Sequence, residues 1–433
     1  CYNSWQLLKG SWTKRYKELL KKVTENDSKQ YKALSYVEDS VWQTLYQQRY
    51  VEENDPLKQS LFDWCTKKFV GDDDEFDTSM IIDEVKALEK KEVKTIRDSL
   101  RIMSAKFLMA FSVLTHTQKC VLKLAVSDII NLNTTKYFRE YLLHLDVDKQ
   151  QELSALQPPS LLSEEETKAI KATFAEHKKA LFVDKMPILC DTTQGKKGQI
   201  GYVMTVMKNK FVEWQREGGD DDDEEEEEES TRKKRKRSFE LDESDVVQIV
   251  KEILNALFAD TLLRWKSGEK TTESCKKMKI QNEMSSSVKG SCRNIMGRRS
   301  DIILYNSKKV PLCLSEVKDG RSTTETTSQE SKSIRCTKSL QVYNTCLSGS
   351  SSIWSLDWCG TRGYIYHLKR HEEVDVVLPG KTLSIPKTKE ELDDLESTLL
   401  ALYELKNFLV EYEGSLKEDF DANHDEGYIF HTP

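Results

Sequence analysis

Three charged residues stand at the ends of two short apolar segments, and their types suit the binding of a divalent cation. Asp301 opens the segment 301–305, and Glu316 and Lys318 close the segment that begins at Val310. Two carboxylates make a hard-oxygen site of the kind that Mg²⁺ or Mn²⁺ prefers. A cation there would acidify a bound water and neutralise charge on a phosphate, while a nearby lysine holds the water or stabilises that charge. The trio therefore predicts metal-dependent phosphate chemistry, although Glu-x-Lys at a strand end is also common as a solvated pair.

The spacing of these residues predicts that they share one face of a hairpin. Side chains alternate between faces along a strand, so one face carries Leu312, Leu314, Glu316 and Lys318. Residues 306–309 have the length of a hairpin loop. If Tyr305 pairs with Val310, Asp301 lies opposite Leu314 and diagonal to Glu316, about 7–8 Å away at Cα. A slip of one residue would move Asp301 to the opposite face and destroy the shared site.

The surrounding pattern divides the chain of 433 residues into a helical part and a mixed part. Residues 1–214 have apolar residues three and four apart and almost no glycine, which indicates a helical domain of unknown role. We expect residues 215–238 to be a linker, 239–412 a folded α/β domain and 413–433 an acidic tail. Within the α/β domain the predicted order is a helix at 245–265, a polar basic loop at 267–300, strands at 301–305 and 310–317, a helix at 331–347, and strands at 353–358, 364–368 and 374–378. The last strand should end at Pro379-Gly380, and a final helix should begin with the capping pattern at Thr388.

Residues 239–378 resemble the PD-(D/E)XK nuclease superfamily, the restriction-endonuclease-like fold. Arg299-Ser300-Asp301 and Glu316-Val317-Lys318 match its Arg-x-Asp and Glu-x-Lys patterns, with Ser300 in place of the namesake proline. The region is most similar to divergent nuclease-like domains of predicted fungal proteins, some of which are joined to Crinkler-type effectors. The resemblance implies a mixed sheet flanked by helices, catalytic roles for Asp301, Glu316 and Lys318, and a further acid on the first helix. Glu243 fits that acid best, and Glu252 is the second choice.

Basic residues near the predicted site suggest contacts with a nucleic-acid backbone. Lys332, Arg335 and Lys338 recur at three-residue spacing on the following helix, and Arg298 and Arg299 end the basic loop. We expect them to contact phosphates of DNA, with weak sequence specificity because few aromatic residues are interleaved. A solvated basic helix face is the alternative.

The linker has an extreme charge pattern. Ten acidic residues occupy 220–229, and without them 63 acidic residues face 66 Lys and Arg, so the net charge of −7 is local. Such a segment is expected to be disordered. The six basic residues that follow match a nuclear localisation signal, which predicts a nuclear protein; a solvated charge run is the alternative. They are Arg232, Lys233, Lys234, Arg235, Lys236 and Arg237.

Other classes of protein are disfavoured. No apolar run is long enough to predict a membrane span. The ten cysteines include no Cys-x-x-Cys pair, and Cys346, Cys359, His367 and His371 are too widely spaced for a zinc finger, so no zinc is expected. The chain begins at Cys1, which indicates a fragment or an incomplete gene model, so a targeting segment could precede it.

Three functions compete at this point. The first is a Mg²⁺- or Mn²⁺-dependent endonuclease-like phosphodiesterase acting on DNA. The second is a catalytically inactive nuclease fold that binds nucleic acid or acts as an effector-like interaction protein. In the third, residues 1–214 bind a protein partner and the nuclease-like domain is vestigial; a large exposed apolar groove in that region would favour this function.

Overall fold

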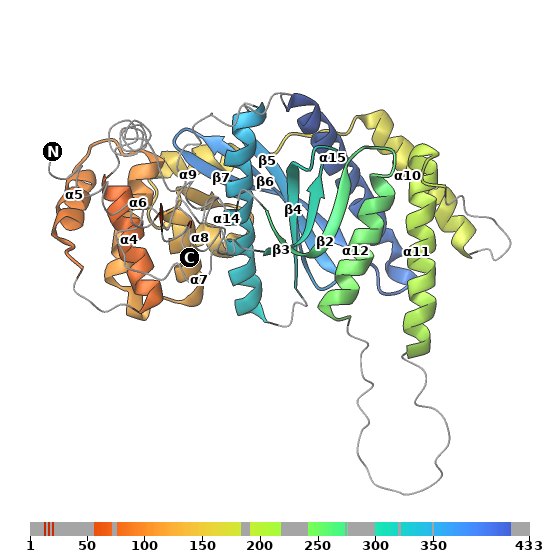
Figure 1. Ribbon diagram of the computed structural model, residues 1–433, viewed down its shortest axis with the longest axis horizontal. Helices are drawn as coiled ribbons and strands as arrows, with labels where there is room; N and C mark the ends of the chain where they lie inside the picture. The colour runs from red at the N-terminus through yellow and green to blue at the C-terminus, as the bar shows by residue number, and fades with distance from the viewer. Residues whose placement is uncertain are drawn as a thin grey trace, which may run out of the picture.

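The computed structural model describes residues 56–71, 76–182, 191–217, 241–272, 299–318, 322–348 and 350–416, with Thr13, Tyr16, Lys17, Leu20 and Cys275 as isolated positions. Within these residues seven strands form one mixed sheet in the order β1-β7-β6-β5-β4-β3-β2 (Figure 1). The pairs β4–β5 and β1–β7 are parallel, and the other neighbours are antiparallel. The strands are β1 (Ile129–Asn131), β2 (Arg264–Thr271), β3 (Arg299–Tyr305), β4 (Pro311–Lys318), β5 (Ser352–Cys359), β6 (Arg362–His371) and β7 (Val374–Ser384).

Four helices share an apolar core with the sheet face that carries Ile302 and Leu304. They are α10 (Glu164–Phe182), α11 (Gly195–Glu217), α12 (Glu243–Leu257) and α15 (Asp393–Ser415), the last preceded by the short 3-10 helix η3 (Glu390–Leu392). On α12 the buried residues Val246, Ile249, Val250 and Ile253 recur at helical spacing, and this apolar stripe holds the helix against the core.

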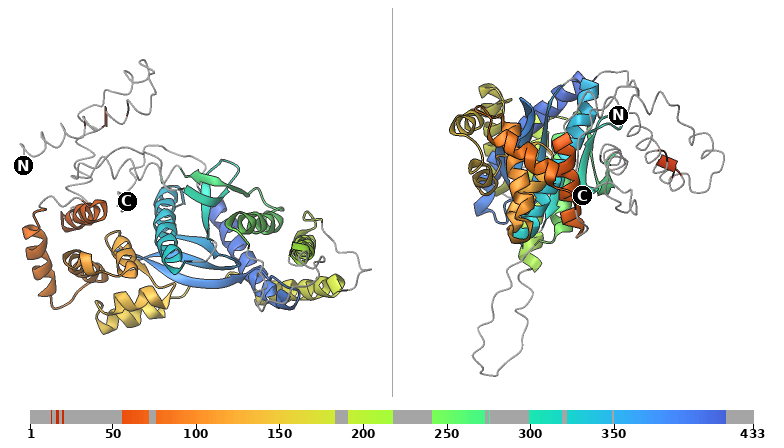
Figure 2. Two further views of the ribbon diagram at one scale, coloured as in Figure 1. Left: turned by 90° about the horizontal axis from the view of Figure 1, so that it is seen from below. Right: turned by 90° about the vertical axis from the view of Figure 1, so that its left-hand side faces the viewer.

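A second core lies on the opposite sheet face, which carries Ile303 and Leu314. The long helix α14 (Thr323–Ser348) contributes Ile334 and Leu340 to it. The N-terminal helices α4 (Pro56–Val70), α5 (Ser79–Glu89), α6 (Ile96–Met109), α7 (His116–Ala125), α8 (Thr135–Leu142) and α9 (Val147–Ala155), with η2 (Phe111–Val113), complete this side. Figure 1 shows α14 between the N-terminal helices and β3–β4, with α11 and α12 beyond these strands, and the left view of Figure 2 shows the same order from below.

The helical region expected to form a separate domain is built into the sheet. β1 comes from residues 1–214 and pairs with β7, with Ile130 opposite Val376. Helices α10 and α11 also share their core with α12 and α15. The expected boundary at residue 214 therefore does not separate two cores. The expected linker and acidic tail lie almost entirely outside the described residues.

Several boundaries within the α/β region differ from the sequence prediction, including the start of the helix expected at 331, which begins at Thr323. The helix expected to reach Trp265 ends at Leu257, and Trp265 lies in β2, part of the segment expected to be a loop. Only one large apolar residue marks this strand, so no alternation revealed it. β7 continues through Pro379-Gly380 to Ser384, because the register shift between Tyr364 and Tyr366 on the partner strand accommodates the proline.

Candidate active site

The β3–β4 hairpin brings Asp301 and Glu316 to one face. Ile303 pairs with Leu314 and Ile302 with Ser315, so the next step of the ladder sets Asp301 beside Glu316. The loop is one residue longer than predicted, and a bulge next to Tyr305 adds another. The resulting shift of two residues equals the side-chain period, so Asp301 keeps the predicted face.

The same bulge corrects one detail of the prediction. Leu312 was expected on the face of Leu314, but Leu312 packs with Ile302 in the first core, whereas Leu314 belongs to the second. The extra residue at the bulge interrupts the alternation of side chains between the two faces, so Leu312 and Leu314 face opposite sides of the sheet. Glu316 and Lys318 lie beyond the bulge and are unaffected by it.

Glu316 is a buried carboxylate with one satisfied and one unsatisfied oxygen. Its side chain is 1% exposed, and its Oε2 accepts a hydrogen bond from the Lys332 ammonium at 2.7 Å. Its Oε1 is buried and has no hydrogen-bond partner among the described residues. Burial raises the pKa of Glu316 to about 8, with a further increase from Asp301, although Lys332 opposes the shift.

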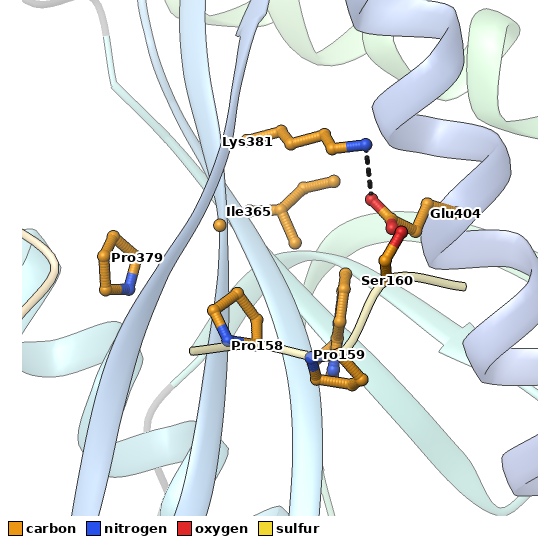
Figure 3. A pocket seen from close by; sticks show the side chains of 9 residues that line it. Pro158, Pro159, Ser160, Ile365, Pro379, Lys381 and Glu404 are labelled. Carbon is orange, nitrogen blue, oxygen red and sulfur yellow. Dashed lines mark ion pairs between the residues drawn. The ribbon is translucent and has the colours of Figure 1, made fainter. Parts of the chain in front are cut away.

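A second buried glutamate shows what a satisfied site looks like. Glu404 on α15 accepts from the backbone N–H of Leu161 at 2.9 Å through Oε1 and pairs with Lys381 at 2.8 Å through Oε2. This ion pair borders a cavity of about 200 Å³ lined by Pro158, Pro159 and other residues (Figure 3). None of the predicted catalytic residues lines that cavity. The unsatisfied oxygen of Glu316 therefore distinguishes its site from an ordinary buried Glu–Lys pair.

Asp301 is tied to the strand that carries Glu316. Its Oδ2 accepts a hydrogen bond from the backbone N–H of Val317 at 2.7 Å. Burial raises the pKa of Asp301, outweighing the lowering effects of that amide, Lys318 and Lys332. Two neighbouring carboxyls with raised pKa values are the pattern expected where a cation or proton normally compensates charge.

Lys318 is anchored by Glu243, the acid predicted on the first helix. Its ammonium lies 2.9 and 3.0 Å from the two carboxylate oxygens of Glu243. Glu243 is in the first turn of α12, immediately after the capping residue Asp242. Although burial opposes it, the pKa of Lys318 is raised by Glu243 and Asp301, so the side chain stays protonated. The second choice for this acid, Glu252, instead accepts a hydrogen bond from Gln248 at 2.6 Å.

Asp357 was not identified from the sequence, and it accepts a hydrogen bond from the backbone of Glu316 on the neighbouring strand. Asp357 lies opposite Glu316 in the parallel β4–β5 pair and is fully buried. It accepts hydrogen bonds from the backbone N–H of Glu316 at 3.2 Å, from Ser333 at 2.8 Å and from Tyr364 at 3.2 Å. Burial raises its pKa well above the ordinary value. The available signal was a single acid inside the apolar run Ile353–Trp358.

The predicted basic helix face is wrong for two of its three residues. Lys332 reaches the site and pairs with Glu316, but Arg335 and Lys338 are 3% and 1% exposed. Arg335 donates from Nε to the Ser331 carbonyl, and Lys338 pairs with Asp375 at 2.8 Å. The N-terminal helices cover this side of α14, so neither residue can contact phosphate.

The remaining predicted basic residues are only partly described. Arg299 is exposed at the start of β3. Arg298, the loop before it and the basic run 232–237 lie outside the described residues. The structure therefore describes four of the five predicted phosphate-binding residues. Three of them lie on α14, and Arg299 lies on β3.

Comparisons with known proteins do not assign the chain to a family. No protein-family model matches the chain, and no curated protein or solved structure matches it either. In the part of the chain that the structure describes, no three or more His, Cys, Asp or Glu side chains form a metal-binding group. Among the same residues, no helix has the length and apolar character needed to cross a membrane.

Proposed function

We propose that this protein is a metal-dependent phosphodiesterase of the PD-(D/E)XK type that acts on DNA. The observation that carries the proposal is the convergence of Asp301 and Glu316 on one face, with a buried, unpartnered Oε1 on Glu316. Lys318, two residues further along β4, is held by Glu243. DNA as the substrate and the nucleus as the location rest on the basic run 232–237 and Arg299.

The residues present fit a hard divalent cation. The unpartnered Glu316 oxygen and the carboxylate of Asp301 would hold it, and both are the donor type that Mg²⁺ or Mn²⁺ selects. When bound, such a cation supplies a more acidic water and neutralises charge on the phosphate. It would also compensate a buried oxygen whose lack of a partner is costly.

The chain's own residues divide the remaining work. Lys318 is protonated, so it donates hydrogen bonds to an attacking water or to the phosphate and does not act as a general base. Glu243 sets the position of the Lys318 ammonium from α12. Asp357 fixes the backbone of Glu316, and the amide of Val317 fixes Asp301.

The test is cleavage of plasmid and linear DNA by the full chain with Mn²⁺, Mg²⁺ or a chelator. We expect cleavage with either cation and none with the chelator. Asp301→Asn should lower the rate at least about tenfold, because it removes a charged metal ligand. The matched control is Asp83→Asn, whose aspartate is 79% exposed on α5 and should be silent. Equal cleavage by Asp301→Asn and the wild type would show that the site is misassigned.

The Glu243–Lys318 pair gives a second, smaller prediction. Glu243→Gln should slow metal-dependent cleavage about tenfold, because Lys318 loses the anion that positions its ammonium. The control is Glu164→Gln, since Glu164 also occupies a first helical turn but is 93% exposed. A Glu243→Gln rate equal to that of the wild type would remove Glu243 from the site.

The Lys332–Glu316 pair favours a second candidate function. Because Lys332 occupies one oxygen of Glu316, the site could be a non-catalytic scaffold that binds nucleic acid or a protein partner. This function predicts salt-sensitive DNA binding without turnover, retained in Asp301→Ala and Glu316→Ala. Metal-dependent turnover by the wild type would exclude it.

A further inference from the structure

Lys332 places a positive charge on a predicted metal ligand. Its ammonium is 2.7 Å from Oε2 of Glu316, a carboxylate 1% exposed, and it also lowers the pKa of Asp301. One cationic group is therefore close to both carboxylates that would hold a divalent cation. An ammonium and a metal ion at this point compete for the same negative charge.

The two lysines of the site have different attachments. Lys318 is paired with Glu243, an acid outside the predicted ligand pair. Lys332 comes from α14 and pairs with the ligand itself. Both side chains are 33% exposed, so each ammonium has access to solvent. A cation on Oε1 of Glu316 therefore competes with the Lys332 ammonium for the charge of one carboxylate, whereas the Lys318–Glu243 pair involves neither predicted ligand.

We propose that Lys332 neutralises Glu316 in the metal-free protein, and that a divalent cation bound to Oε1 of Glu316 and to Asp301 displaces the Lys332 ammonium by taking over the charge of this carboxylate. This inference rests on the proposed function and adds a residue that tunes it. In the metal-free protein Lys332 partly compensates a buried carboxylate that would otherwise be costly. Displacement frees its ammonium at the mouth of the site, where a substrate phosphate would replace Glu316 as its partner. Lys332 thus acts as a latch. Its ammonium leaves Glu316 when the metal binds, and its positive charge lowers the affinity of the site for the metal.

The first experiment measures Mn²⁺ affinity of the full chain by electron paramagnetic resonance of the free ion. It compares wild type, Lys332→Met, Lys332→Arg and Glu316→Gln, each at a pH where its affinity no longer changes with pH. Lys332→Met should bind roughly tenfold tighter or more, because one competing unit charge is removed at short range. Lys332→Arg should stay near the wild type, and Glu316→Gln should lose binding.

The second experiment needs no variant of the site. The full chain is treated briefly with acetic anhydride with and without Mn²⁺, and lysine acetylation is mapped by mass spectrometry. Acetylation of Lys332 should rise severalfold with Mn²⁺. Lys196 is the internal reference, because it is similarly exposed at 36% and pairs with Glu166 at 2.8 Å on distant elements.

The outcomes separate the latch from the proposed function. Mn²⁺ binding by the wild type with no gain in Lys332→Met, or with unchanged acetylation of Lys332, overturns the latch and leaves the nuclease proposal standing. Absence of Mn²⁺ binding by the wild type and by Lys332→Met overturns both. Tighter binding together with increased acetylation supports the latch.

Discussion

Glu316→Gln is expected to reduce metal-dependent cleavage about a hundredfold or more while stabilising the protein at alkaline pH. The loss follows because glutamine keeps the size of the side chain but removes the charge that would hold a cation. The gain in stability follows because Glu316 is buried with one unpartnered oxygen, so its charged form destabilises the folded state.

The sign of the stability effect follows from the pKa. Burial raises the pKa of Glu316 from an ordinary 4.5 to about 8. Between these values the folded protein keeps a proton that the unfolded chain releases, so its stability falls as pH rises through this window. Glutamine has no proton to lose. The variant should therefore gain stability relative to the wild type from acid to alkaline pH, on the order of a few kcal/mol.

The measurement is the midpoint of chemical denaturation of both proteins across that pH range, alongside the cleavage rate. Glu404→Gln is the matched control, since Glu404 is also buried and paired with lysine but lies outside the site (Figure 3). It should keep full activity. Parallel pH profiles for wild type and Glu316→Gln would refute the claim that the charged form of Glu316 destabilises the fold.

The largest effect on stability is expected from Asp375→Asn, at about 3–5 kcal/mol. Asp375 on β7 is the partner of Lys338, which is 1% exposed, and it also accepts from Arg370 at 3.1 Å. Burial lowers the pKa of Lys338, and Asp375 opposes that shift. Without this carboxylate, an ammonium in the core between α14 and the sheet loses the acidic group that pairs with it at 2.8 Å.

The Lys338–Asp375 pair interacts with other charged groups, so the free-energy cost of Asp375→Asn involves more than this one ion pair. Asp128 precedes β1, pairs with Lys58 of α4 and interacts with Lys338. Although burial opposes the shift, Lys58 and Lys338 lower its pKa to about 2. The stability that Asp128 contributes is therefore present above its ordinary pKa and is lost as pH falls towards 2.

Denaturation monitored by tryptophan fluorescence tests the Asp375 prediction. Asp393→Asn removes an exposed ion pair with Lys178 and should cost less than about 1 kcal/mol. The double variant Lys338→Met, Asp375→Leu should recover much of the loss, because it removes both buried charges. A small effect of Asp375→Asn would mean that Lys338 finds another partner.

The sequence predicted the parts of the site that depend on strand alternation. Asp301 and Glu316 share a face because the side-chain period is two, and the unforeseen shift of the hairpin was also two residues. Glu243 was selected through the family resemblance, as the acid at the entrance of the first helix, and in the structure it directly follows the capping residue Asp242. The shared face of Asp301 and Glu316 is a local feature, so neighbouring residues were enough to predict it.

Features that depend on contacts between residues far apart in the sequence could not be predicted from the sequence pattern. Arg335 and Lys338 looked like a basic surface because their burial is caused by helices more than two hundred residues earlier. β1 has only three residues, and its partner is near the end of the chain. Asp357 becomes meaningful only when β5 is known to lie beside β4.

The pairing of β1 with β7 sets the order in which the protein can be completed during translation. Residues 129–131 leave the ribosome early, but their partners at 375–377 are among the last strands made. Until then the apolar side of the N-terminal helices has no sheet to cover it, which exposes the nascent chain to aggregation. A fragment that starts after the linker would lack β1 and present the open edge of β7, a template for intermolecular pairing. Recombinant work on residues 239–416 alone is therefore expected to yield aggregates, whereas co-expression of the two halves of the chain offers a route to reconstitution.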